Sequence, residues 1–122
     1  MNNKPLKFRV YIPDFKRFLY FDLNKFESTD LSKFHYEGSH LHRQEYPIQQ
    51  YTGCHDSSNK EIYEGDIIKY NDGNSIRIGY IGFMAGIFFL NYSDQTDDEL
   101  GYLLVSNIKV IGNVFENGEL LK

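Results

Sequence analysis

The sequence predicts a mostly β protein, in which an N-terminal β-hairpin region precedes a small curled barrel of about five strands. Three observations predict this class. Aromatic residues make up 16% of the 122 residues, and flat rings pack well on the pleated surface of a sheet. Several short segments alternate apolar and polar side chains, which is the period of a half-buried strand. Residues that favour tight turns, such as Asp72 and Gly73, separate these segments.

The N-terminal region is expected to form a β-hairpin. Residues 7–12 (KFRVYI) alternate, so that three apolar side chains share one face and Arg9 lies on the opposite face. This is the pattern of a strand that is buried on one face only. After a turn that contains a proline, residues 17–23 repeat the pattern and are expected to form the second strand.

The segment 24–45 has two interpretations. Its polar start, Ser28 to Asp30, would cap a short helix that ends near Phe34, but a turn followed by an irregular loop fits as well. A domain boundary is expected only here, before Tyr46. The division is then 1–45, a β region with a variable loop or short helix, and 46–122, a barrel region, unless both form one compact unit.

The C-terminal region is expected to contain short strands joined by tight turns, with an acidic loop at residues 93–99. Gly79 and Gly82 indicate bends or a bulge in a strongly curled sheet. About five such strands between residues 62 and 115 are typical of an SH3-like barrel. The segments expected to be extended are 48–51, 61–64, 67–70, 76–83, 87–92, 102–105 and 109–115.

The charge distribution argues against nucleic-acid binding. The net charge is −4; residues 1–61 carry 9 basic and 8 acidic side chains (+1), and residues 62–122 carry 4 basic and 9 acidic ones (−5). A nucleic-acid-binding protein usually has a basic patch, because neutralising phosphates supplies most of its affinity. We therefore expect no nucleic-acid partner. A nucleic-acid-binding small barrel is kept as the alternative function.

Several features indicate the expected location. Cys54 is the single cysteine, so no intramolecular disulfide is possible and a reducing compartment is favoured. The polar N-terminus is not typical of a signal peptide. The longest apolar stretch, residues 81–90, is too short to span a bilayer. We expect a cytoplasmic protein with no membrane partner.

The histidines and the acidic run were natural candidates for metal ligands. His35, His40 and His42 lie close together in the sequence, but a zinc site needs three or four ligands, and no Cys or carboxylate has the matching spacing. The acidic run at 94–99 lacks the spacing and the central glycine of a calcium loop. We expect neither a metal ion nor a cofactor.

Two further groupings were considered for catalysis. Cys54 and His55 are adjacent, so on an extended chain their side chains point to opposite faces and Cys54 is interpreted as a packing residue. Glu64 and Asp66 resemble paired carboxylates. However, an Asp that follows a glycine and precedes a strand commonly stabilises a turn. No catalytic residue is assigned, and we expect a protein that is not an enzyme.

Three motifs resemble, in order, the signature of the YopX family. Residues 7–10 read KFRV, like the opening strand of the family. Residues 50–68 read QYTGCHDSSNKEIYEGDII, like its central signature, and residues 110–117 read VIGNVFEN, like its closing motif. Cys54 departs from the usual Leu and Gly118 from the usual Pro, and neither departure breaks the resemblance.

The resemblance implies a mostly β fold with an SH3-like C-terminal part, an origin in phages or prophages of Firmicutes, and self-association. It carries over no biochemical function, no catalytic residue and no binding residue. The favoured function is therefore a non-enzymatic, self-associating protein-interaction module whose partner protein is unknown; exposed strand edges and aromatic faces would support pairing. The signature residues are expected to be structural: Tyr51, Thr52, Gly53, Tyr63, Glu64, Gly65, Asp66, Gly112 and Asn113.

Overall fold

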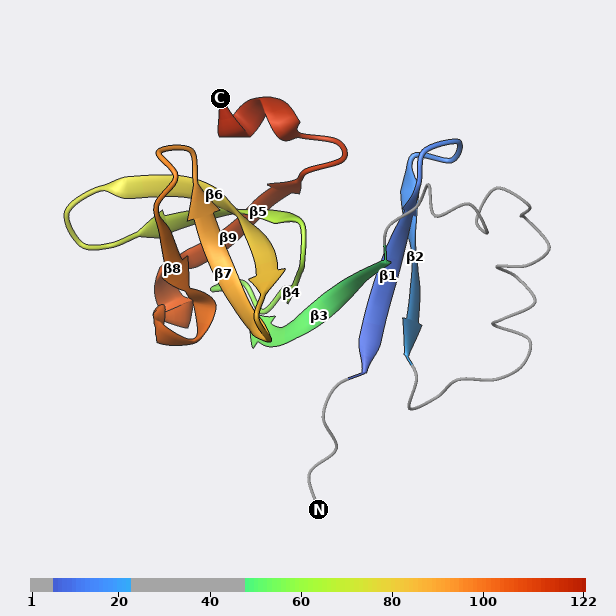
Figure 1. Ribbon diagram of the computed structural model, residues 1–122, viewed down its shortest axis with the longest axis horizontal. Helices are drawn as coiled ribbons and strands as arrows, with labels where there is room; N and C mark the ends of the chain where they lie inside the picture. The colour runs from blue at the N-terminus through green and yellow to red at the C-terminus, as the bar shows by residue number, and fades with distance from the viewer. Residues whose placement is uncertain (1–5, 23–47) are drawn as a thin grey trace, which may run out of the picture. The chain divides into compact units, whose positions relative to one another are not determined.

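The computed structural model describes residues 6–22 and 48–122 (Figure 1). Strands dominate these residues, together with short 3-10 helices and no α-helix, so the predicted mostly β class is confirmed. The chain divides into two compact units, Met1–Tyr51 and Thr52–Lys122. This division lies within a strand, a few residues after the boundary that the sequence suggested. The helix-or-loop alternative for residues 24–45 falls outside the described residues.

The first unit contains the predicted hairpin. Strands β1 (Lys7–Ile12) and β2 (Arg17–Asp22) pair antiparallel, with Val10 opposite Leu19. The start of β3 (Ile48–His55) pairs antiparallel with the other side of β1. Strand β1 is therefore a central strand, in a sheet whose order is β2-β1-β3-β4.

Arg9 differs from the expectation for a strand buried on one face. Its side chain is only 4% exposed, and its neighbours Val10 and Tyr11 are buried as well. The Nε–H of Arg9 donates to Oε1 of Gln49 at 2.8 Å, and the guanidinium lies 4.0 Å from the centroid of the Phe18 ring. A charged side chain can be buried when its donors are paired and an aromatic face covers it, which alternation alone does not reveal.

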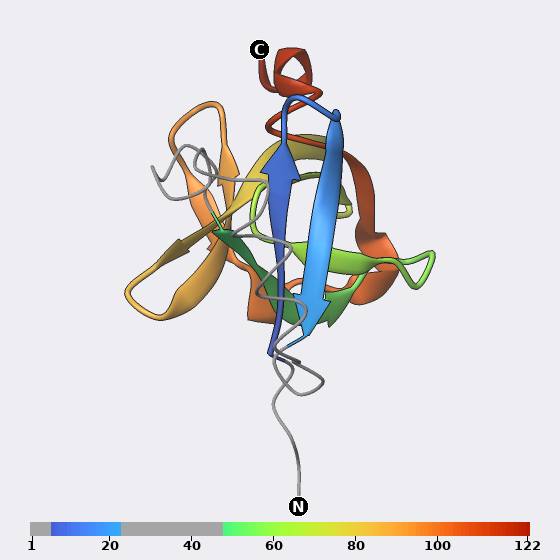
Figure 2. The same ribbon diagram turned by 90° about the vertical axis from the view of Figure 1, so that its right-hand side faces the viewer.

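The second unit is built on a five-stranded antiparallel sheet of order β8-β7-β6-β5-β9. Figures 1 and 2 show that this sheet curls strongly, as predicted for the barrel region. The short strand β4 (Glu61–Tyr63) follows β3 and belongs to the four-stranded sheet. The five strands are β5 (Asp66–Asn71), β6 (Ile76–Met84), β7 (Ile87–Tyr92), β8 (Asp97–Glu99) and β9 (Ile108–Asn113).

Two segments near residue 100 differ from the prediction. The expected strand at 102–105 is replaced by two 3-10 turns, η3 (Leu100–Tyr102) and η4 (Val105–Asn107), and only Leu100 of this run is buried. Part of the expected acidic loop is strand β8, which pairs antiparallel with β7, and Asp98 accepts a hydrogen bond from the Tyr92 hydroxyl at 2.7 Å. A polar segment thus forms a strand, and an apolar segment forms turns that are largely exposed.

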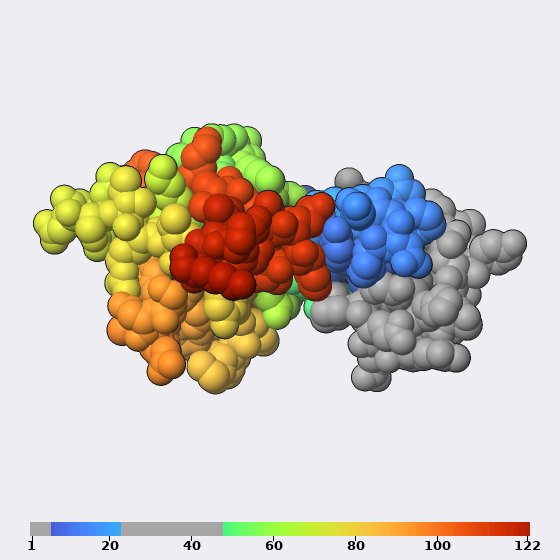
Figure 3. All heavy atoms as spheres, turned by 90° about the horizontal axis from the view of Figure 1, so that it is seen from above, coloured from blue at the N-terminus to red at the C-terminus, as the bar shows by residue number. Residues whose placement is uncertain are grey.

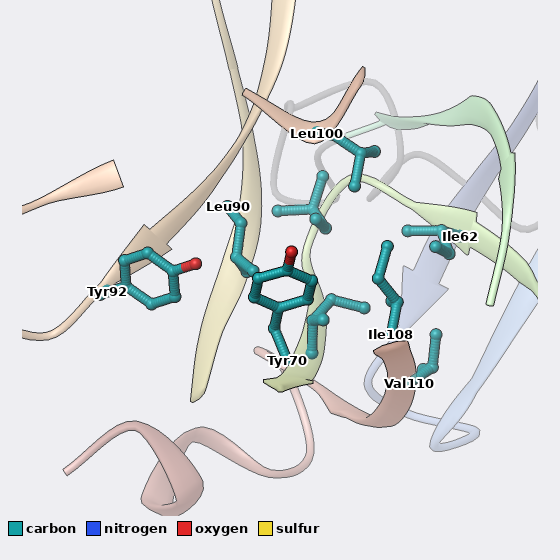
Figure 4. Close-up of a cluster of buried hydrophobic side chains, with 9 residues drawn as sticks. Ile62, Tyr70, Leu90, Tyr92, Leu100, Ile108 and Val110 are labelled. Atoms are coloured by element: carbon teal, nitrogen blue, oxygen red, sulfur yellow. The ribbon is translucent and has the colours of Figure 1, made fainter. Parts of the chain in front are cut away.

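The hydrophobic core of the second unit lies inside the curl of the sheet (Figure 4). Ile62, Ile68 and Leu90 are fully buried, and burying one such side chain stabilises the fold by roughly 1.5–3 kcal/mol. Cys54 packs against this cluster, which agrees with its interpretation as a packing residue. The buried members are Ile62, Ile68, Tyr70, Ile81, Leu90, Tyr92, Leu100, Ile108 and Val110.

Gly79 and Gly82 do not form the bulge that the sequence suggested. The register shift lies between β5 and β9, at Ile67 and Ile68. A Cβ at Gly79 would overlap the backbone carbonyl of Asn91, and a Cβ at Gly82 would lie 2.6 Å from the Asn91 side-chain nitrogen. Gly79 therefore makes room for the backbone of β7, so a larger residue does not fit there, whereas at Gly82 only the end of a side chain would have to move.

The turn between β6 and β7 contains a residue with an unfavourable backbone conformation. Ala85 and Gly86 both have positive φ, 55° and 80°, as in the type I′ turns that match the twist of paired strands. Only Gly86 adopts this conformation without cost, because it lacks a Cβ.

We predict that Ala85→Gly raises the free energy of unfolding, by about 0.5–1 kcal/mol, because it relieves the left-handed conformation. The matched control is Gly86→Ala, which should lower it by a similar amount, since a Cβ there meets nothing within 4 Å and only the backbone is strained. Urea unfolding followed by circular dichroism measures both. A change of the same sign for both substitutions would contradict this account of the turn.

Candidate functional site

The central signature and the closing motif meet in the second unit, at the buried carboxylate of Asp56. One of its oxygens accepts hydrogen bonds from the backbone N–H groups of Ser58 at 2.8 Å and Lys60 at 2.9 Å. The other accepts from the N–H of Val110 at 3.0 Å. One carboxylate thus shapes the turn between β3 and β4 and attaches that turn to β9.

Burial alone would raise the pKa of Asp56, but the N–H groups of Val110, Lys60 and Ser58, together with the charge of Lys109, hold it below its ordinary value. The side chain is 4% exposed and its oxygens are occupied by backbone donors. Asp56 is therefore an acceptor that stabilises the backbone, rather than a general base facing a substrate.

Thr52 and Gly53 shape the second half of β3. The Thr52 hydroxyl donates to the carbonyl of Ile62 at 2.8 Å and accepts from the N–H of Cys54 at 3.1 Å. Gly53 has a φ of +86°, which a residue with a side chain rarely adopts. These two residues allow the strand to change course without leaving its polar groups unpaired.

The carboxylates considered for catalysis lie at the turn from β4 to β5. Asp66 is 2% exposed and accepts a hydrogen bond from the N–H of Tyr63 at 2.8 Å. Gly65 has a φ of +87°; its N–H donates to Ile81, and its carbonyl accepts from Val114. The second carboxylate, Glu64, is half-buried. The turn therefore ties the closing motif to the start of the sheet.

Asn113 and its neighbours organise the chain after β9. The Asn113 side-chain oxygen accepts from the N–H groups of Phe115 and Glu116, both at 3.0 Å, and its amide donates to the Glu116 carboxylate at 2.9 Å. A Cβ at Gly112 would lie 2.5 Å from Oδ1 of Asn117. These contacts of the closing motif stabilise the turn that leads into η5 (Gly118–Leu121).

Two tyrosines complete the signature, and both are buried. Tyr51, 5% exposed, ends the first unit, where the Lys7 ammonium lies 5.3 Å from its ring centroid. Tyr63, 4% exposed, has a hydroxyl 3.3 Å from the carboxylate of Glu61. Their burial is typical of core residues rather than of a stacking surface.

The acidic run makes internal contacts. Asp94 pairs with Arg77 at 3.2 Å, and hydrogen bonds from Thr96 lower the pKa of Asp94. Asp98 accepts a hydrogen bond from the Tyr92 hydroxyl. Burial of the Tyr92 side chain, and to a smaller extent the Asp98 carboxylate, raise the pKa of Tyr92. On β8, Asp97 is exposed and Glu99 is half-buried.

The described residues, 6–22 and 48–122, contain no group of three His, Cys, Asp or Glu side chains that could hold a metal ion. His35, His40 and His42 lie outside them. Within the same ranges, no helix has the length and apolar character needed to cross a membrane.

The second unit also exposes large apolar side chains. Ile76, Ile78 and Tyr80 alternate along β6 and are 57%, 36% and 40% exposed. Met84, at the tip of the next hairpin, is 62% exposed, and Tyr102 is 83% exposed. The sequence showed the alternation in β6 but not which face is buried, since both faces of this strand carry apolar residues.

Asp56 is the structural residue that the sequence reasoning did not single out, although it lies inside the signature. Its signal was local: an Asp followed by Ser-Ser-Asn often forms a turn through its side chain. The contact with Val110, 54 positions away, had no local signal.

This fold defines the class of protein: a small, curled, antiparallel β domain whose signature residues stabilise turns. The model of the YopX protein family matches residues 7–122, and the chain belongs to this family. A search of curated proteins finds no match.

A solved structure is similar over the same length. It is the crystal structure of protein EF1440 from Enterococcus faecalis, with a TM-score of 0.61 and 24% sequence identity, covering 99% of this chain and 100% of that one. At this identity, the likeness shows the fold.

We predict that Asp56→Asn lowers the free energy of unfolding by about 2–3 kcal/mol, because one acceptor oxygen becomes an NH₂ group facing buried N–H donors. Urea unfolding measures the loss. The control is Asp97→Asn, an exposed carboxylate, which should change stability by less than about 0.5 kcal/mol.

The stabilisation by Asp56 should also depend on pH. Since the folded pKa of Asp56 lies below its ordinary value of 3.8, its contribution is present above that pH and is lost as the pH falls through the folded pKa. Similar losses in both variants would contradict the role of Asp56.

Proposed function

We propose that this chain is a non-enzymatic, self-associating protein-interaction module. The observation that carries the proposal is the apolar surface of the second unit, above all Ile76, Ile78 and Tyr80 on β6. Contiguous exposed apolar side chains are typical of interaction sites. The same unit has a complete core of its own, so these residues are not needed to fill it.

No catalytic group is assigned, because the polar side chains of the signature bind the backbone. Asp56, Asp66 and Asn113 are buried and accept hydrogen bonds from backbone N–H groups. A general acid or base must reach a substrate proton, and these groups are turned toward the backbone. This supports a binding role. We also propose a phage or prophage origin and a location in the bacterial cytoplasm, which the family resemblance and the single free cysteine favour.

We predict that the full-length chain elutes from gel filtration as an oligomer. Multi-angle light scattering should give a multiple of the 14.4 kDa monomer mass at tens of micromolar. Circular dichroism of the same sample verifies that the protein is folded. A folded species of 14.4 kDa across this concentration range would contradict self-association.

The alternative, a nucleic-acid-binding small barrel, has a limited basis. Lys69 and Lys109 are exposed and lie opposite each other on β5 and β9, and Lys69 lies opposite Ile78 of β6. Tyr80, two positions further along β6, is also exposed, and an exposed aromatic ring can stack on a base. The acidic side chains Asp97 and Glu99 lie on the same sheet, and phosphates would be repelled there.

We predict no binding of single- or double-stranded oligonucleotides in fluorescence anisotropy, even at low salt. The acidic half of the chain is the physical reason, since nucleic-acid affinity requires an excess of neutralising cations. Binding that weakens steeply as salt is added would instead support the alternative, and Lys69→Gln would then serve as the variant that tests the lysines.

A further inference from the structure

Two exposed lysines lie directly opposite each other in the five-stranded sheet. Lys69 of β5 is the cross-strand partner of Lys109 of β9. Opposite residues of an antiparallel pair share one face, with Cβ atoms about 4.5–5.5 Å apart, and like charges in such a position destabilise the sheet. An anion between the two ammonium groups would remove this repulsion.

No carboxylate of the described residues, 6–22 and 48–122, forms a salt bridge with either lysine. The charge of Lys109 acts on the carboxylate of Asp56. However, the oxygens of Asp56 already accept from three backbone N–H groups. Within the same ranges, the Lys69 side chain has neither a hydrogen bond nor an ion pair. The positive charge of this pair is therefore available to a ligand from solution.

A hydroxyl group lies beside the lysines. The Lys109 ammonium donates to the Ser58 hydroxyl at 3.2 Å, and a hydroxyl that accepts in this way can still donate its own proton. Ser58 is exposed, but its turn is held against β9 by the bond from the Ser57 N–H to the carbonyl of Ile108. Figure 3 shows the green β3–β4 turn beside the orange-red β9. The fold thus places three donor groups from three segments at one exposed spot.

We propose that Lys69, Lys109 and Ser58 bind one phosphate monoester dianion, carried by a phosphorylated side chain or by a small phosphate ester. Two ammonium groups match its charge of about −1.5 to −2 at neutral pH, and the hydroxyl donates to a phosphate oxygen. Two lysines suffice for one such group, whereas a nucleic acid needs many neutralising cations. The inference requires neither self-association nor nucleic-acid binding.

The test is a titration of the ¹⁵N-labelled full-length chain with methyl phosphate at constant ionic strength, followed by nuclear magnetic resonance. The amide signals of Ser58, Lys69 and Lys109 should shift most and should saturate. Lys69→Gln should weaken binding on the order of tenfold, because a charge-assisted hydrogen bond is lost. Ser58→Ala should weaken it by a smaller factor, and it leaves the backbone bond from the Ser58 N–H to Asp56 in place.

The matched control is Lys122→Gln, which removes the same charge at the end of the chain, outside β5, β9 and the β3–β4 turn, and should leave the affinity unchanged. Dimethyl phosphate is the matched ligand, because it is similar in size but carries one charge, as a nucleic-acid phosphate does. It should bind on the order of tenfold more weakly than methyl phosphate, since one charge-assisted contact is lost. Circular dichroism verifies folding of each variant, and Lys109→Gln replaces Lys69→Gln should that variant not fold.

Three outcomes would overturn the inference: no saturable shift at these residues, equal weakening by Lys69→Gln and Lys122→Gln, or equal affinities for methyl and dimethyl phosphate. A second titration, with a blocked phosphoserine peptide, distinguishes the two sources. Tighter binding of the peptide than of methyl phosphate supports a phosphorylated side chain, and equal binding supports a small phosphate ester. None of these results depends on the oligomeric state, so the proposed self-association is tested separately.

Discussion

The fold of the second unit depends on one buried carboxylate. Asp56 receives three backbone hydrogen bonds of 2.8 to 3.0 Å, and they connect a turn early in the barrel with its last strand. The Ser57 N–H adds a bond to the carbonyl of Ile108. Each buried N–H would otherwise lose a partner at a cost of about 1–3 kcal/mol. Pairing these donors therefore also holds the turn between β3 and β4 against β9.

Much of this fold could be predicted from the sequence, because its signals are local. The β6–β7 turn is marked by Gly86, and the core face of β5 by Ile68 and Tyr70. What could not be predicted depends on distant partners. Arg9 is buried because Phe18 and Gln49 cover and pair it. The segment 102–105 turns although its residues favour a strand, with Leu103 half-buried against the core and Tyr102 and Leu104 exposed.

The residues of the candidate site also divide into those with a local signal in the sequence and those whose role depends on distant partners. Gly53 and Gly65 have positive φ, and Asp66 accepts a hydrogen bond from a nearby backbone N–H; both are local properties that a sequence can signal. The sequence reasoning did not identify Asp56, whose role depends on a strand 54 positions away. It also could not locate an interaction surface, because alternation in β6 does not show which of two apolar faces is covered.

The folded structure shows which charged side chains remain at the surface, and the net charge alone does not. The second half of the chain is acidic, yet Asp66 is buried against a backbone donor, and Asp94 is paired with Arg77. These carboxylates add little to the field that a partner meets at the surface. What remains on the outer side of the barrel sheet is a face with both signs, basic on β5 and β9 and acidic on β8. A surface with both signs lacks the excess of cations that binding of a uniformly charged polymer such as nucleic acid requires.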